Sequence, residues 1–154
     1  MSETRSKPTL GHRVFGEFSW AGGQIPPALA GQPLPLKTGV IEDVKALLPG
    51  EEHEAVQSAL ARWTRGVPYL YAMLEPDAQR VDLEGNSVEE VTAKQRDHAK
   101  GLLEYKQVNK ARKQHREVLA ALDAIDRMFK EPNRENMTAA KKGTAEIRRL
   151  LTWK

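Results

Sequence analysis

The stretch from Arg62 to Gly85 constrains the fold most strongly, because it combines a break between two helices with a tight turn. Gly66 ends the helical pattern that precedes it, and Pro68 follows where a new helix tolerates the missing N–H group. Residues 82–86, Asp-Leu-Glu-Gly-Asn, have the composition of a hairpin turn. The stretch therefore predicts a short helix over 67–74 followed by a β-hairpin.

The start of this short helix is also a predicted anion site. A helix that begins at Gly66 leaves its first N–H groups without partners, and its dipole is positive at that end. Arg65 and Tyr69 fall on the break and the first turn, and Arg80 enters the first hairpin strand. Together these groups predict a pocket for one phosphate-bearing end of a ligand.

The remaining elements follow from periodicity and capping patterns. Thr38 is a predicted N-cap, and Thr92-Ala93-Lys94-Gln95 has the pattern of a capping box. In the short helix, Leu70 and Met73 are expected to face the core, and Tyr71 is interpreted as a packed tyrosine. The expected elements are helices over 37–48, 51–64 and 67–74, strands over 79–83 and 86–91, a long helix from residue 92, and helices over 118–130 and 144–153. They predict a predominantly helical α+β fold.

Charge is distributed unevenly along the 154 residues. Residues 1–90 contain 8 lysines and arginines against 13 acidic residues, whereas residues 91–154 contain 16 against 8. Residues 104–117 are strongly basic and have almost no apolar face. Such a segment is typical of a polyanion-binding arm, and a solvated helix with excess lysine is the alternative interpretation.

Composition argues against several classes of function. The chain contains no cysteine, so thiolate metal sites and disulfides are excluded. Its four histidines lack metal-ligand spacing, and His98 is interpreted as a structural histidine. No known catalytic motif is present, so we expect neither catalysis nor a metal or cofactor. No apolar run is long enough to span a membrane and the N-terminus lacks a signal-peptide core, so a cytoplasmic protein is expected.

Three regions are expected. Residues 1–33 are rich in glycine and proline and predict a flexible segment whose aromatic side chains lie on the domain. Residues 34–105 form the folded domain. Residues 106–154 are expected as a basic helical extension, with 118–130 and 144–153 paired as an α-hairpin. This hairpin packs on the domain or pairs with a second copy of the chain.

The ordered residues of the central region resemble the ProQ/FinO domain family of bacterial RNA chaperones. The similarity begins at Leu36-Lys37-Thr38-Gly39-Val40, continues through residues 69–73, and is sharpest at Arg80-Val81-Asp82-Leu83-Glu84-Gly85-Asn86. It ends near His98. The resemblance implies a compact, mostly helical domain that binds structured RNA, notably a terminator hairpin with a single-stranded 3′ tail, without catalysis.

The resemblance also implies partners and site residues. Its partners would be small RNAs and mRNA 3′ ends, in post-transcriptional control. The residues expected to form the 3′-end pocket are Lys37, Thr64, Arg65, Gly66, Tyr69 and Arg80. The residues expected to follow the duplex backbone are Arg62, Lys94, Arg96, Lys100, Lys106, Lys110, Arg112 and Lys113.

Some positions depart from the family pattern. Gln57 and Ala61 stand where basic residues are frequent, and Gly66 replaces a common serine cap. The N-terminal helix of the family is not apparent in residues 1–36. The alternative interpretation is therefore a protein-interaction module that kept the fold and uses its N-terminal aromatic residues and C-terminal amphipathic helices.

Overall fold

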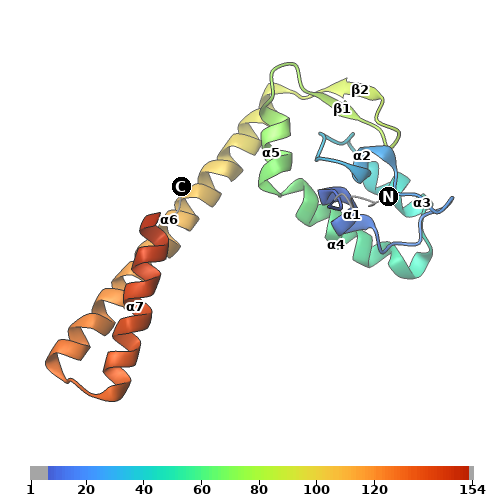
Figure 1. Cartoon of the computed structure of the whole chain (residues 1–154). Helices are drawn as coiled ribbons and strands as arrows, with labels where there is room; N and C mark the ends of the chain where they lie inside the picture. Colours follow the sequence, from blue (N-terminus) through green and yellow to red (C-terminus); the bar gives the residue numbers. More distant parts are fainter. Residues whose placement is uncertain (1–6, 153–154) are drawn as a thin grey trace, which may run out of the picture. The chain divides into compact units, whose positions relative to one another are not determined.

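The structure, a computed structural model, describes residues 7–152 (Figure 1). Most of the described residues are helical, and β1 and β2 form a small antiparallel sheet, which confirms the predicted predominantly helical α+β fold. The chain divides into two compact units between Leu103 and Glu104. The elements in chain order are α1 (Leu10–Phe15), α2 (Pro27–Ala30), α3 (Val40–Ala46), the 3₁₀ helix η1 (Gly50–Glu52), α4 (His53–Thr64), α5 (Val67–Leu74), β1 (Gln79–Val81), β2 (Ser87–Glu90), α6 (Ala93–Lys130) and α7 (Arg134–Thr152).

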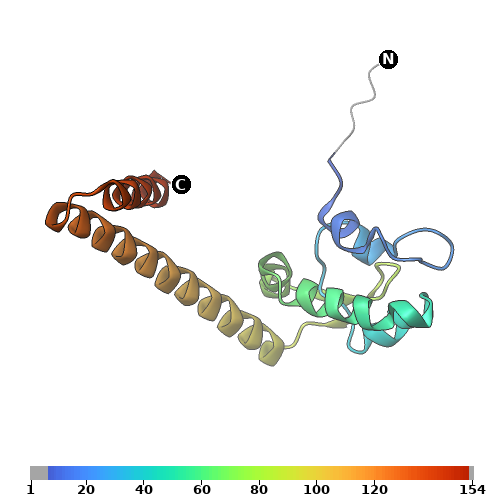
Figure 2. The same ribbon diagram turned by 90° about the horizontal axis from the view of Figure 1, so that it is seen from below.

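The core of the first unit is centred on aromatic side chains from the N-terminal segment. Phe15, which is fully buried, lies edge-on to Trp63 of α4 with ring centroids 5.2 Å apart. Trp20 is also buried, and its indole N–H donates to the carbonyl oxygen of Phe15 at 2.9 Å. Helix α1 packs against α2 and α4, an arrangement visible in Figures 1 and 2.

These contacts place the aromatic side chains of residues 1–33 against the domain, as the sequence predicts, and within its core. From Leu10 onward the chain supplies two helices and part of the core, because its aromatic and aliphatic side chains fill the space above α4. The sequence pattern did not indicate helix α1. Residues 1–6 lie outside the described part of the chain.

Helix α3 is shorter than predicted and begins differently. Its N-cap is Gly39, which adopts a left-handed backbone conformation with φ of +77°. Thr38 does not cap the helix. Its backbone N–H and its hydroxyl donate instead to the Glu89 carboxylate of β2, at 3.0 and 2.9 Å. The predicted cap is thus a cross-link between the segment before α3 and the hairpin.

The hairpin is anchored to that same segment. Its turn is confirmed: the Asp82 carboxylate accepts from the backbone N–H of Asn86 at 2.8 Å, and Gly85 has a φ of +92°. Strands β1 and β2 are shorter than predicted. Leu36 forms a parallel bridge with Val81, so residues 35–37 run beside β1 and extend the sheet.

The second unit is an antiparallel helical hairpin, in which α7 runs beside the end of α6 (Figures 1 and 2). The predicted hairpin is present, but its final helix begins at Arg134 rather than Thr144. Asn133 caps it by accepting from the backbone N–H of Asn136 at 2.8 Å. The helices meet where Gly143 faces Ala121 so closely that an added Cβ would lie 3.0 Å from the Ala121 carbonyl oxygen. Trp153 lies outside the described residues.

Candidate functional site

A cavity with a volume of about 910 Å³ opens within the first unit. Side chains from α5, β1, the beginning of α6 and the segment before α3 surround it. Its apolar wall consists of Leu36, Val40, Leu70, Met73, Ala99 and Leu102. Its polar and charged residues are Lys37, Thr64, Arg65, Tyr69, Arg80, Thr92, Lys94, Gln95 and His98.

The structure brings together most of the residues expected in a 3′-end pocket. Lys37, Thr64, Arg65, Tyr69 and Arg80 all line the cavity, although they come from four separate parts of the first unit. Gly66 is not among the lining residues. The predicted cluster therefore exists as a spatial group, with its glycine outside it.

Tyr69 and Arg80 are both held by the backbone of Leu36. The Tyr69 hydroxyl oxygen accepts a hydrogen bond from the Leu36 backbone N–H at 3.0 Å. The Arg80 guanidinium donates to the Leu36 carbonyl oxygen and, through Nε, to the Gln95 side chain at 3.2 Å. Both side chains are thus oriented in advance by the segment that runs beside β1.

The hydroxyl of Tyr69 is available as a hydrogen-bond donor. Burial raises the pKa of Tyr69, although the bond from Leu36 and the charge of Arg80 oppose this effect. Since an ordinary tyrosine already titrates near about pH 10, the group is protonated at neutral pH. Within residues 7–152 the structure gives this proton no acceptor, so a ligand in the cavity can receive it.

The backbone at the start of α5 offers fewer donors than the sequence indicated. The Gly66 N–H donates to the Trp63 carbonyl oxygen at 3.0 Å, and Pro68 has no N–H. Val67 and Tyr69 remain as the N–H groups of the first turn. Anion binding at this site therefore depends on side chains more than on the helix terminus.

The charged groups around the cavity are basic. Lys37, Arg65, Arg80 and Lys94 line it, and no carboxylate does so among the described residues. Lys37 has an ion pair with Asp43 at 2.5 Å, which raises the pKa of the lysine. The Arg80 Nε lies 3.7 Å from a Glu89 oxygen. The cavity thus combines an apolar wall with a cationic rim, which suits a ligand with both a flat apolar part and a phosphate.

Three polar lining residues, Thr92, Gln95 and His98, were not predicted as site residues. His98 is exposed at the cavity, which corrects its interpretation as a structural histidine. Gln95 completes the predicted capping box, because its side chain accepts from the Thr92 N–H at 3.0 Å. Gln95 and His98 stand at helical spacing from Ala99 and Leu102, and this spacing in the sequence indicates that all four share one face of α6.

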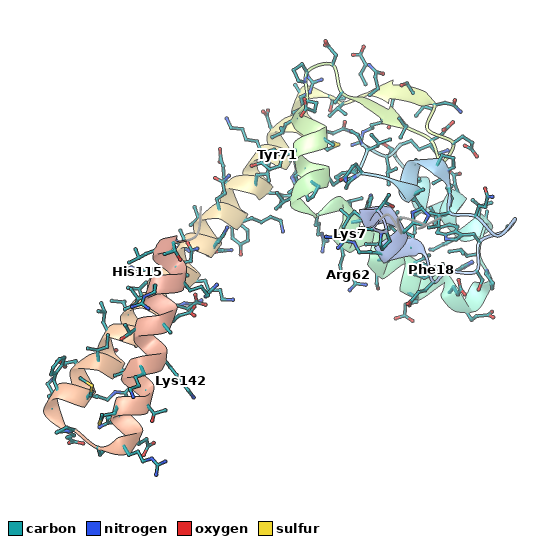
Figure 3. The ribbon with its side chains drawn as sticks, in the orientation of Figure 1. Lys7, Phe18, Arg62, Tyr71, His115 and Lys142 are labelled. Atoms are coloured by element: carbon teal, nitrogen blue, oxygen red, sulfur yellow. The ribbon has the colours of Figure 1, made fainter. Side chains whose placement is uncertain are left out.

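Tyr71 (Figure 3) is 51% exposed, so its interpretation as a packed tyrosine is wrong.

The residues expected along an RNA duplex are divided between the two units. Lys94 lines the cavity, whereas Arg62 (Figure 3) and Lys100 are exposed outside it. Arg96 is partly buried, and its Nε has no hydrogen-bond partner in the described structure. The remaining four, Lys106, Lys110, Arg112 and Lys113, lie on α6 in the second unit.

The contact between Thr38 and Glu89 makes stability depend on pH. Hydrogen bonds from Thr38 hold the pKa of the Glu89 carboxyl below its usual range. The resulting stabilisation is complete above the unfolded-state pKa of about 4.3 and is lost as the pH falls through the folded-state value. We expect the urea midpoint to decrease below about pH 4.3, and Glu89→Gln to reduce that decrease. Glu90→Gln, one position along β2, is the matched control, and equal pH slopes for wild type and Glu89→Gln would contradict the assignment.

Comparison with known proteins now identifies the family. The ProQ/FINO family model matches residues 26–117, which is more than half of the chain. The chain belongs to the ProQ/FINO family, as the resemblance indicated. The matched range extends beyond the expected 34–105 at both ends and includes α2 and the whole basic segment 104–117 of α6.

One relative is the RNA chaperone ProQ of Idiomarina loihiensis. It is 33% identical over 88 residues, which cover 55% of this chain and 42% of the relative. The chain thus spans less than half the length of that relative. None of the described helices is both long and apolar enough to cross a membrane.

Proposed function

We propose that this chain is a cytoplasmic RNA-binding protein that acts as a chaperone or post-transcriptional regulator without catalysis. The observation that supports it is the cavity of the first unit, which joins an apolar wall to four basic residues and has no carboxylate among its described lining residues. Family membership and the name of the RNA chaperone relative favour the same conclusion.

The proposed ligand of the cavity is the 3′ end of a structured RNA, such as the single-stranded tail of a terminator hairpin. An unpaired end exposes the faces of its bases and sugars, which can lie against Leu70, Met73 and Leu102. A terminal phosphodiester can pair with Arg65, Arg80 and Lys94. The Tyr69 hydroxyl can then bond to a sugar or phosphate oxygen. In the cell such ends belong to small RNAs and mRNAs.

Binding that depends on the cavity is expected to require an accessible 3′ end. The test compares a hairpin with a single-stranded 3′ tail, the same RNA with a 3′ phosphate, and the same hairpin with its tail moved to the 5′ end, by fluorescence anisotropy. Blocking or moving the end should weaken binding by about 1–3 kcal/mol, the effect of one or two lost hydrogen bonds. Equal affinities for the three RNAs would reject the cavity as the 3′-end site.

A salt titration separates this function from the alternative of a protein-interaction module. Contacts to phosphate release counterions, so the affinity for RNA should fall steeply between low and physiological salt. A flat response, or no binding at low salt, would favour the alternative.

A further inference from the structure

The hairpin of α6 and α7 leaves one face apolar and uncovered in the described structure. On α6, Val118, Leu122, Ile125 and Phe129 follow at alternating spacings of four and three residues. Leu122 and Phe129 are 49% and 75% exposed. Val118 and Ile125 are partly buried, and Ala121 lies against Gly143 of α7.

The same spacing continues toward the start of the unit. His115, Ala111 and Val108 extend the pattern through alternating intervals of three and four residues, and His115 is labelled in Figure 3. A seam of this kind, repeated over three heptads, is the pattern by which one helix packs along another. The face is therefore shaped for a helical partner.

Helix α7 adds a second stripe to the same face. Met137 and Leu151 are 47% and 80% exposed, and Ile147 lies between them on the same side of α7. Leu122 follows Ala121 by one position, as Thr144 follows Gly143. The two helices are antiparallel and meet at Ala121 and Gly143, so the residue that follows each of these points to the same side of the hairpin. The exposed apolar stripes of α6 and α7 therefore lie on one side.

The contact between α6 and α7 buries little apolar area, so an exposed apolar face is costly for this hairpin. Its buried residues in the described range 104–152 are all small: Ala121, Ala124, Ala140 and Gly143. The larger apolar side chains of the described range, such as Val118, Ile125 and Ile147, are at most partly buried. The hairpin therefore gains little from burial, because the stabilisation follows the apolar area removed from water. Covering the apolar face would supply the missing area.

We propose that a second copy of this chain covers the face, with the two α6 helices antiparallel about a twofold axis near Leu119 and Ala120. The seam is complementary to itself in this arrangement. Arg112 and Asp126 lie seven residues on either side of Leu119, so each meets the other residue of the partner copy. Phe129 falls opposite Ala111 of the second copy, so a large side chain faces a small one.

The charges agree with this pairing. Asp126 forms an exposed ion pair with Lys130 on its own helix at 2.7 Å, an interaction too weak to prevent a further contact. Flanking charges of opposite sign select the direction and register of helix pairs. A twofold pair places Arg112 of each copy beside Asp126 of the other, so both contacts join opposite charges.

The association state of the nuclease-treated full chain tests the proposal by sedimentation velocity, since bound RNA could otherwise link two copies. At about 50 µM we expect a dimer, and Leu122→Glu should raise its Kd by about thirtyfold or more, the effect of losing a central interface residue. Leu122 is half exposed in the single chain, so the helical circular dichroism should persist. Ala145→Glu, on the outer side of α7, is the matched control. A monomeric wild type, or a dimer unaffected by Leu122→Glu, would overturn the proposal.

Charge reversal tests the antiparallel twofold arrangement itself. Arg112→Asp and Asp126→Arg should each weaken self-association by about tenfold, because each brings like charges together twice. Mixing the two single variants should restore a heterodimer, in which both pairs are again of opposite sign. The double variant Arg112→Asp/Asp126→Arg should also recover. Failure of both combinations to recover would exclude this register.

A cysteine cross-link gives a second measure of the same geometry, because the chain has no cysteine of its own. Leu119→Cys should be joined efficiently to its copy by a short bismaleimide, since the twofold axis passes near this position. Lys142→Cys should not be cross-linked, because nine positions of helix separate Lys142 from Leu151 and place the two on opposite sides of α7. Lys142 is labelled in Figure 3. Equal cross-linking of the two variants would contradict the proposed interface.

Discussion

Replacing Arg80 with alanine is expected to weaken RNA binding by about 1.5–3 kcal/mol, or about ten- to a hundredfold in Kd. Arg80 lines the cavity with most of its side chain protected from solvent, so its contact with a phosphate is poorly screened. Arg80→Lys keeps the charge but loses the planar fork, and an intermediate affinity is expected. Anisotropy titrations with the 3′-tailed hairpin measure both variants.

The control separates this local effect from a general loss of charge. Arg62→Ala removes one positive charge from an exposed position outside the cavity, so it should change affinity only slightly and in a salt-dependent way. Because Arg80 also holds the Leu36 carbonyl, thermal melts must show that the variant is folded at the assay temperature. Equal losses for Arg80→Ala and Arg62→Ala would rule out a specific role for Arg80.

Phe15→Ala is expected to destabilise the first unit by about 3–5 kcal/mol, the range for a large aromatic side chain removed from a core. Phe15 is fully buried between Trp20 and Trp63, and alanine would leave a cavity that the surrounding helices cannot fill. Urea unfolding followed by tryptophan fluorescence reports this directly, because both indoles lie against the mutated side chain.

Leu34→Ala is the matched control, because Leu34 also belongs to the N-terminal part of the chain but is 41% exposed. Leu34→Ala should lower the free energy of unfolding by much less than Phe15→Ala, since little apolar area is returned to water. A cost below about 1 kcal/mol for Phe15→Ala would mean that the N-terminal segment is not part of the cooperative core.

Local patterns in the sequence were sufficient for most of the elements. The glycine and proline around the start of α5, the Asp82–Asn86 turn and the capping box at Thr92 are each determined by neighbouring residues. The predicted elements therefore appear in the expected order, although their ends move by several residues. Local patterns indicated Arg65, Tyr69 and Arg80, and the family resemblance added Lys37 and Thr64 to the residues that line the cavity.

The failures concern contacts between residues far apart in the chain. Thr38 carries the chemistry of a helix cap, but Glu89, 51 positions away, competes for its donors. Phe15 and Trp20 stand among glycines and prolines without periodicity, and only the surface of α4 gives them a place to pack. The exception is Gly66, which was assigned to the anion site although its N–H donates to the carbonyl oxygen of Trp63, only three residues earlier.

The backbone of Leu36 gives the cavity a thermodynamic connection to the segment of residues 35–37 that runs beside β1. Its N–H is bonded to Tyr69 and its carbonyl to Arg80, so displacement of residues 35–37 would release both side chains from their present orientation. A ligand that requires this orientation binds only while the strand beside β1 is in place. Occupancy of the cavity must then suppress local opening of that strand by the same free energy that opening takes from binding. Retarded amide exchange at Leu36 would be the direct signature of this reciprocity.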